Sequence, residues 1–361
     1  MNGYLLKLLV RDRIGELLRG PEAERQARGA QDGKPLRAWR LPELIQIQKL
    51  PRVTWAAAAL PVVWFTQGST FVALKVGVAS VPPFLLSGTR FVLVGLLLLT
   101  WAAWRAGWRI HIERRDVMLA AGTGLGLFLA GQGSASWSSQ FLAPGVVAVL
   151  TSTIPLWAAL IGLVAFRTGL GKLGSVGLLA GFAGVAFLAW PGAGTIVAAG
   201  PALLVVAGAG CWGAAVVVVS RSGIGRRPAL ITSIQALLGG GLQIVLGLAT
   251  GEADHVQLGA AVAAIPAFAY LVVVSSLIGF PLLTWLLSEV RVDIANTASY
   301  VAPVIALALG WLLLAERITP RTLGGVAVIL VGVAAMVWSA RPRQAAETEL
   351  EPTVEFEELA A

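Results

Sequence analysis

Ten stretches of mainly apolar residues run through this chain of 361 residues, separated by short connections rich in Gly, Pro and charged residues. About 20 apolar residues in a helix span the roughly 30 Å of hydrocarbon in a bilayer. The stretches lie at 53–75, 83–104, 117–136, 144–165, 173–190, 202–220, 229–249, 264–286, 294–314 and 323–340. The sequence therefore predicts an all-α integral membrane protein with ten transmembrane helices.

The composition agrees with a membrane protein and excludes a soluble enzyme. Apolar residues make up 57% of the chain and charged residues 13%, whereas soluble domains carry about 25% charge. Cys211 is the single cysteine, and His111 and His255 are too far apart to build a metal centre. We therefore expect no metal site, no cofactor and no disulfide framework.

The net charge of +8 is concentrated in the N-terminal tail, where residues 1–52 hold eleven Lys or Arg against six acids. This basic tail precedes the first apolar stretch and has no aromatic interleaving, so we expect it to attract anionic lipid headgroups rather than nucleic acid. It forms either a helix on the membrane surface or a disordered tail. An acidic tail of six Glu lies between Glu347 and Glu358.

Lys and Arg residues fall mainly in alternate connections, which sets the expected orientation. The tails and the connections near 105–115, 167–172, 221–227 and 291 carry them. We therefore expect a cell-membrane protein with both termini cytoplasmic. The expected units are a tail at 1–52, two five-helix repeats at 53–192 and 200–340, and a tail at 341–361.

The two predicted repeats are related by a constant shift of 148 residues. Matched pairs include Trp64 with Trp212, Pro155 with Pro303, Gly162 with Gly310, Gly177 with Gly325 and Trp190 with Trp338. A unit of five helices is odd, so the second copy crosses the membrane in the opposite sense. Inverted repeats are typical of secondary transporters, whose solute site lies near the midplane between the halves.

Several motifs in residues 53–341 resemble the EamA family of the drug/metabolite transporter superfamily. The first helix contains Trp64–Phe71 and ends in Lys75, the second begins with Pro82-Pro83 and carries Arg90, and the fourth contains Leu150–Leu156. The ninth reads Tyr300-Val301-Ala302-Pro303-Val304 and ends Gly310–Glu316. The resemblance implies ten helices and export of metabolites or amino acids; Arg167-Thr168 departs from the acidic end of the motif.

Two prolines are candidates for the solute pathway. Pro155 and Pro303 fall in the middle of the fourth and ninth predicted helices, and each removes a hydrogen bond to the carbonyl four residues earlier, at Thr151 and Ser299. A freed carbonyl beside a hydroxyl is a polar spot that solute or water can use. A simple packing kink is the alternative.

Aromatic and polar side chains near mid-membrane are further candidates. Trp64, Trp157 and Trp212 lie too deep for an interfacial belt, so they line a cavity or fill gaps between helices. The remaining candidates are polar residues, each of which could instead make an ordinary interhelical hydrogen bond: Gln67, Gln132, Gln235, Ser275, Ser276 and Tyr300.

Lys75 and Arg90 are the ionisable residues expected at the edge of or within the membrane core. Charges there are costly and are often functional, although a long stem can also carry the charge to the interface. All nineteen acids fall in tails or connections. This pattern favours a facilitator, or coupling through an edge residue such as Glu289 or Asp293.

Together these features favour a secondary transporter of small solutes working by alternating access. Lys75 and Arg90, which no acid in the membrane core opposes, favour a solute with a carboxylate. The mid-membrane Trp residues favour a solute that also has an apolar part, as amino acids and related metabolites do. The alternatives are a membrane-embedded enzyme, for which we find no nucleophile or metal set, and an assembly protein without transport.

Overall fold

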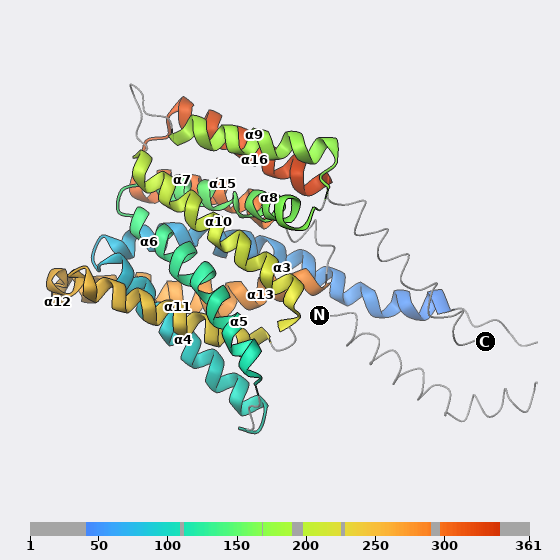
Figure 1. Ribbon diagram of the computed structural model, residues 1–361, viewed down its shortest axis with the longest axis horizontal. Helices are drawn as coiled ribbons and strands as arrows, with labels where there is room; N and C mark the ends of the chain where they lie inside the picture. Colours follow the sequence, from blue (N-terminus) through green and yellow to red (C-terminus); the bar gives the residue numbers. More distant parts are fainter. Residues whose placement is uncertain are drawn as a thin grey trace, which may run out of the picture.

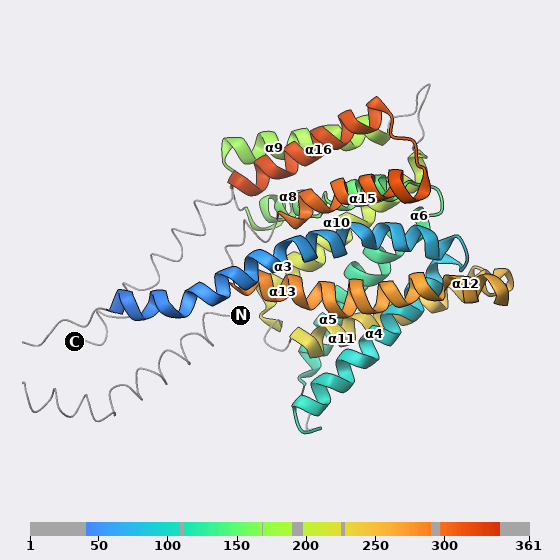
Figure 2. The ribbon, with the colours of Figure 1, turned by 180° about the vertical axis from the view of Figure 1, so that it is seen from behind.

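The structure is a computed structural model that describes residues 41–108, 112–167, 169–189, 198–224, 228–289 and 297–339. Within these ranges the chain makes ten helical crossings, several nearly parallel and others, such as α4 (Pro83–Arg105), strongly oblique to them (Figures 1 and 2). The predicted all-α membrane fold is confirmed.

The first half holds five crossings, two of which consist of several helical segments. They are α3 (Leu41–Val78), α4 (Pro83–Arg105), the run α5 (Arg114–Gly124), η1 (Leu125–Gln132) and α6 (Gly133–Ser138), the pair α7 (Pro144–Thr151) and α8 (Ile154–Phe166), and α9 (Lys172–Ala189). The segment η1 is a π-helix. Several of these helices begin with proline, whose missing N–H costs nothing in the first turn.

The second half repeats this order. It comprises α10 (Ala199–Ser222), α11 (Pro228–Ala249), the run α12 (Leu258–Tyr270), η4 (Leu271–Gly279) and α13 (Phe280–Glu289), then α15 (Ala298–Leu314) and α16 (Pro320–Ser339). A short 3-10 turn, η3 (Glu252–His255), joins α11 to α12. The segment η4 is a second π-helix.

Local geometry confirms that the two halves are copies. The π-helices fall in the third crossing of each half. Arg167 and Ala315, which are 148 positions apart, both end their helix with φ near +53°, and their cap N–H groups reach Gly162 O and Gly310 O. The first helices of the halves, α3 and α10, run in opposite directions (Figure 1). The chain is therefore built as two inverted five-helix repeats.

Glycines let equivalent helices of the two halves approach closely. A β-carbon at Gly88 of α4 would lie 2.8 Å from Gly240 O of α11, and one at Gly240 would lie 2.9 Å from Gly88 O. In the same way Gly177 of α9 lies against Gly332 of α16. Because lipid gives helices no hydrophobic reason to associate, such close contacts supply much of the packing energy.

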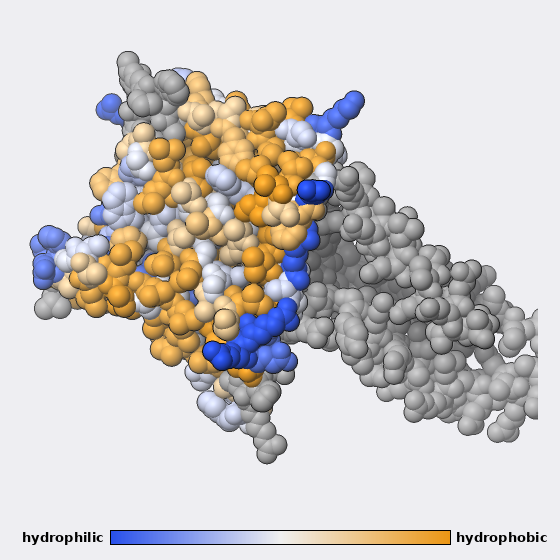
Figure 3. All heavy atoms as spheres, viewed as in Figure 1, coloured by the Kyte–Doolittle hydropathy of each residue, from blue (hydrophilic) through white to orange (hydrophobic). Residues whose placement is uncertain are grey.

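The outer surface of the bundle is apolar, as a bilayer requires. Val164, Leu179, Leu313 and Val331 are each at least 67% exposed. Orange apolar side chains cover much of the surface in Figure 3, and the hydrophilic residues gather mostly toward its edges. Among the described residues, seven helices or helical runs are long and apolar enough to cross a membrane, and Lys172–Leu188 and Ala298–Leu314 are shorter apolar helices.

The main differences from the predicted boundaries lie in the first and fourth crossings. α3 begins at Leu41 rather than near 53, because good helix formers such as Glu43, Leu44 and Lys49 precede the apolar stretch and the helix continues through Pro51. The fourth crossing is interrupted at Ser152 and Thr153, whereas the sequence predicted one continuous helix. The predicted C-terminal tail and most of the N-terminal tail lie outside the described residues.

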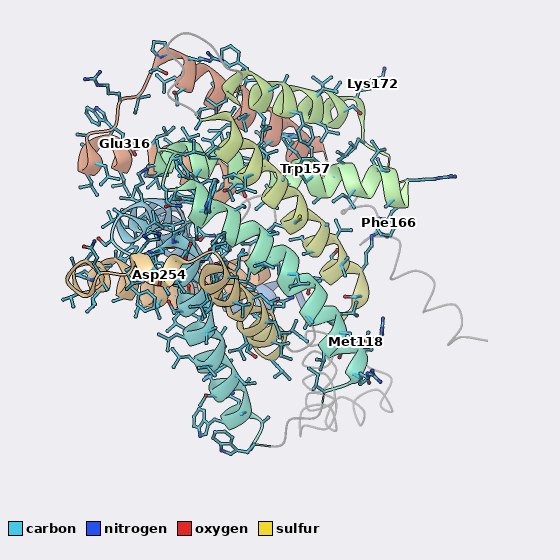
Figure 4. All side chains as sticks on the ribbon, turned by 60° about the vertical axis from the view of Figure 1, so that its left-hand side comes forward. Met118, Trp157, Phe166, Lys172, Asp254 and Glu316 are labelled. Carbon is cyan, nitrogen blue, oxygen red and sulfur yellow. The ribbon has the colours of Figure 1, made fainter. Side chains whose placement is uncertain are left out.

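The connections form two sets at opposite ends of the bundle. We call the end with Asp254 and Glu316 the outer end and the end with Met118, Phe166 and Lys172 the inner end, after the predicted orientation (Figure 4). Asp254 and Lys172 are both exposed. They therefore offer labelling sites for testing that orientation.

We expect Asp254→Cys to react with a membrane-impermeant maleimide on intact cells and Lys172→Cys to react only after permeabilisation, with Cys211 replaced by Ser in both. The reason is the excess of Lys and Arg at the inner end. Labelling of both sites from the same side would contradict the ten-span fold, and the reversed pattern would invert the orientation.

Candidate solute site

Arg90 is the one charged side chain among the buried residues of the described chain, with 1% of its surface exposed. It lies two turns into α4, where a helix start at Pro83 sets its depth below the outer end. A charged group at such a depth costs about 3 kcal/mol or more in a membrane helix. Its retention there requires specific partners or a function.

Hydroxyl groups of η4 hold the guanidinium. Arg90 Nε donates to Ser276 Oγ at 3.0 Å, and Nη2 donates to Ser275 Oγ at 2.7 Å. The Arg90 guanidinium carbon also lies 4.7 Å from the centre of the Phe91 ring. Nη1 is buried and has no hydrogen-bond partner among the described residues.

The π-helical geometry of η4 places both serines toward α4. Ser276 Oγ donates to Leu271 O five residues earlier at 3.0 Å, which suits the wider turn. Single-turn π segments inside α-helices are often found at functional sites. Two adjacent serines on one wide turn can therefore reach the same guanidinium.

The first helix extends this polar cluster. Thr70 Oγ1 of α3 donates to Ser275 Oγ at 2.8 Å, so Ser275 accepts from both α3 and α4. One residue earlier, Ser69 Oγ and Tyr270 OH share a hydrogen bond of 2.6 Å. We call Ser69, Thr70, Arg90, Ser275 and Ser276 the Arg90 cluster.

The Arg90 cluster has the chemistry of an anion site. Its partners are neutral, so the positive charge has no carboxylate counter-ion among the described residues. A guanidinium has five N–H donors, and the contacts to the serines leave the edge formed by Nη1 and Nη2 able to donate further. Such an edge matches the two oxygens of a carboxylate.

Lys75 occupies a separate position at the outer end of α3. Its Nζ donates to Gln140 O at 3.2 Å and to Leu142 O at 3.1 Å, in the connection between α6 and α7. The side chain thus reaches backbone carbonyls at the outer interface. It does not join the Arg90 cluster, and Glu316 of the connection after α15 lies close enough to interact with it electrostatically.

The comparison with known proteins identifies the family. The EamA-like transporter family matches residues 54–190 and 200–338, one match in each half. The chain belongs to the EamA-like transporter family. It is therefore a multi-pass membrane transporter of the drug/metabolite superfamily, as the resemblance in the sequence implied.

Individual relatives agree with this assignment. The "uncharacterized inner membrane transporter YedA" of Escherichia coli K12 is 29% identical over 301 residues, covering 80% of this chain and 92% of its own. The "uncharacterized transporter YoaV" of Bacillus subtilis is 24% identical over 300 residues, which cover 78% of this chain and 95% of that protein. One solved crystal structure matches with a TM-score of 0.53 at 21% sequence identity and covers 79% of this chain and 98% of its own. That match supports the fold alone.

The two proline elements of this transporter differ in geometry. Pro155 lies in the first turn of α8, directly after the interruption at Ser152 and Thr153, whereas Pro303 lies inside the continuous helix α15. Pro155 therefore lies at the centre of the fourth crossing, as predicted, but the helix is interrupted there rather than continuous. Pro155 has no N–H to donate to the carbonyl of Thr151, four residues earlier, so the helical hydrogen-bond series is interrupted between α7 and α8.

The hydroxyl beside the first proline is already bonded. Thr151 Oγ1 donates to Val147 O at 2.7 Å, and Ser152 and Thr153 also bond to carbonyls of α7. Thr151 is thus occupied within its own helix, while Ser299 and Tyr300 lie half-buried in the first turn of α15. The broken helix itself remains a candidate element of the pathway.

The three mid-membrane tryptophans occupy different environments. Trp64 Nε1 donates to Thr297 Oγ1 at 3.1 Å, and its side chain packs against a buried cluster that includes Val63 and Leu286. Trp212 lies against Gly131 of η1. Trp64 and Trp212 therefore pack between helices.

Trp157 differs from them in one respect. Its ring packs edge-on against Phe182 at 5.0 Å and lies against Gly210 of α10, yet its Nε1 is buried without a hydrogen-bond partner among the described residues. Of the three, Trp157 is therefore the strongest candidate for contact with solute or water.

The glutamine candidates are not gathered around Arg90. Gln235 Nε2 donates to Thr123 Oγ1 at 2.8 Å, an ordinary bond between α11 and α5. Gln67 and Gln132 are half-buried, on α3 and η1. Of the predicted candidates, the structure brings together Arg90, Ser275 and Ser276.

Three residues of interest were missed in the sequence. Ser69 and Thr70 lie within the motif Trp64–Phe71 but were not chosen as candidates, and neither was Tyr270. In the sequence, such hydroxyl residues look the same as residues that make ordinary interhelical hydrogen bonds. Thr70 lies five residues before Lys75 on α3, so a search for hydroxyls one to two turns from a membrane cation could have found it.

Proposed function

We propose that this transporter exports amino acids or related small carboxylated metabolites by alternating access. The buried guanidinium of Arg90 carries the proposal, because it faces neutral hydroxyls and keeps a donor edge for an anion. A solute carboxylate would supply the missing counter-charge. The inverted repeats support alternating access, since rocking one half against the other is the usual working of this plan.

The buried state of Arg90 agrees with a cycle in which the site is reached from one side at a time. With 1% of its surface exposed, the side chain lies away from both ends. Solute would enter or leave only after the halves separate at one end. The direction of transport rests on the family resemblance, and the cytoplasmic termini on the distribution of Lys and Arg.

The test is uptake by purified full-length protein in liposomes, with pairs of solutes that differ only in charge. An amino acid and its amide, or a carboxylic acid and its amide, keep the apolar body and remove the negative group. We expect the acid of at least one pair to be transported and its amide to be rejected. Equal transport of both members in every pair would contradict a carboxylate-binding site.

We expect downhill solute flux to persist when the pH gradient across the liposomes is collapsed. No Asp or Glu is buried among the described residues, so no carboxylate at the midplane is available there to relay a proton. The predicted edge residues Glu289 and Asp293 have no described side chains. The measurement compares downhill solute flux under an imposed pH gradient with the flux after a protonophore has collapsed that gradient. A strict requirement for the gradient would contradict the expectation.

A further inference from the structure

The outer ends of three helices meet at a junction that joins the two halves. Lys75 at the end of α3 donates to Gln140 O and Leu142 O, all within the first half. Glu316 lies in the connection that follows α15, within the second half. We call Lys75, Glu316 and the connection 139–143 the outer junction.

Glu316 is held over the start of α7. A β-carbon at Gly310 would lie 2.6 Å from Glu316 Oε2 and 3.8 Å from Pro144 Cγ, so the carboxylate lies against the bare Cα of Gly310, with Pro144 nearby. The backbone supports this position, because Ala315 turns the chain with φ +53° and Glu316 N donates to Gly310 O at 3.3 Å. Figure 4 shows Glu316 at the outer end.

Close packing of the same helices surrounds the outer junction. Gly145, in the first turn of α7, lies directly against Leu307 of α15: a β-carbon there would lie 2.9 Å from Leu307 Cα and would overlap the Leu307 side chain. This is a contact between the first and second halves. In alternating access it must loosen before solute can leave at the outer end.

We propose that Glu316 is the proton-binding residue of the outer gate: while ionised it attracts Lys75 across the two halves and keeps the outer end closed, and its protonation lets the end open. This inference rests on the proposed alternating access. In the protonated state Lys75 keeps its two carbonyl partners in the first half but loses its attraction to the second half.

The charges around the carboxylate single out Lys75 as its partner. The connection 139–143 and α7 contain no titratable residue, and α15 contains only Tyr300, at its inner end. Arg317 is exposed beside Glu316, and Arg321 of α16 donates to a carbonyl of α9. Lys75 of α3 is the cation that interacts with Glu316 electrostatically among the described residues.

The direction in which the pKa of Glu316 is shifted agrees with proton binding at the outer junction. Burial raises the pKa of its carboxyl above the ordinary value, and the Lys75 ammonium lowers it by a smaller amount. The acid therefore takes up its proton at a higher pH than an exposed Glu. Acidifying the outer side favours the neutral form and, with it, the open gate.

The test measures access to a buried position below the outer junction. Val146 in α7 is 4% exposed, and Phe141 in the neighbouring connection is 52% exposed. Val146→Cys and Phe141→Cys are placed singly in a Cys211→Ser background and labelled on intact cells with a membrane-impermeant maleimide. The rate at Phe141→Cys corrects for the effect of pH on thiol reactivity.

We expect the corrected labelling rate of Val146→Cys to rise at least about fivefold when the outer pH falls from about 8 to about 5. Glu316→Gln should give the high rate at both pH values, and Glu316→Asp should keep the rise. Lys75→Met should also label fast at both values. Folding of each variant is checked by size-exclusion chromatography.

Glu252→Gln is the matched control, since Glu252 is another half-buried outer acid, which caps α4 by accepting from Phe84 N and Leu85 N. It should leave the rise unchanged. Three results would each overturn the assignment. They are a corrected labelling rate that does not depend on pH, a rise that persists in Glu316→Gln, and a rise that is lost in Glu252→Gln as well. Because labelling needs no solute, this result is independent of whether a carboxylate is transported.

Discussion

Replacing Arg90 by glutamine is expected to reduce transport of a carboxylated solute by about 10- to 150-fold. A hydrogen bond to a charged group contributes about 1.5–3 kcal/mol, and a factor of ten corresponds to about 1.4 kcal/mol. Glutamine keeps a polar group near Ser275 and Ser276 but removes the positive charge. The measurement is initial uptake in liposomes at several solute concentrations.

Two further variants separate charge from general disturbance. Arg90→Lys keeps the charge but loses the forked donor geometry, so we expect an intermediate loss. Arg105→Gln changes an exposed arginine at the inner end of the same helix and should leave transport unchanged. Unaltered transport in folded Arg90→Gln protein would contradict the carboxylate site.

Removing the two prolines is the second prediction with a large expected effect. Pro303→Ala restores a backbone hydrogen bond inside α15 and should raise the free energy of unfolding by about 1 kcal/mol or leave it unchanged. Pro155→Ala allows α7 and α8 to join into one helix across Ser152 and Thr153. We expect each change to lower transport at least about fivefold, equivalent to about 1 kcal/mol, because both straighten elements beside the interface of the halves.

Pro266→Ala is the matched control for helix straightening. Pro266 lies inside α12 and is exposed on the surface of the bundle, so its removal should leave transport intact while thermal stability rises or stays constant. Thermal unfolding and liposome uptake are measured on the same preparations. If both proline variants transported like the unchanged protein, the prolines would be packing kinks only.

The sequence by itself determined the membrane class, the number of crossings and the inverted repeat. These follow from properties of single segments: the apolar length needed to cross the hydrocarbon and the cost of placing charge there. The same shift of 148 residues relates the C-terminal caps of α8 and α15, Arg167 and Ala315. Arg90 was found for the same reason, because a charge in an apolar helix stands out without knowledge of its neighbours.

Only the tertiary structure decided which side chains meet. Ser275 and Ser276 contact Arg90 from positions 185 and 186 residues away, and Gln235 is occupied by Thr123 instead. Glu316, which the sequence placed in a connection without a role, lies close enough to Lys75 to interact with it electrostatically. Partners depend on the rotation of each helix about its axis and on glycine contacts such as Gly88 with Gly240. Small apolar residues fit many rotations almost equally well, so the sequence leaves that rotation open until all ten helices pack together.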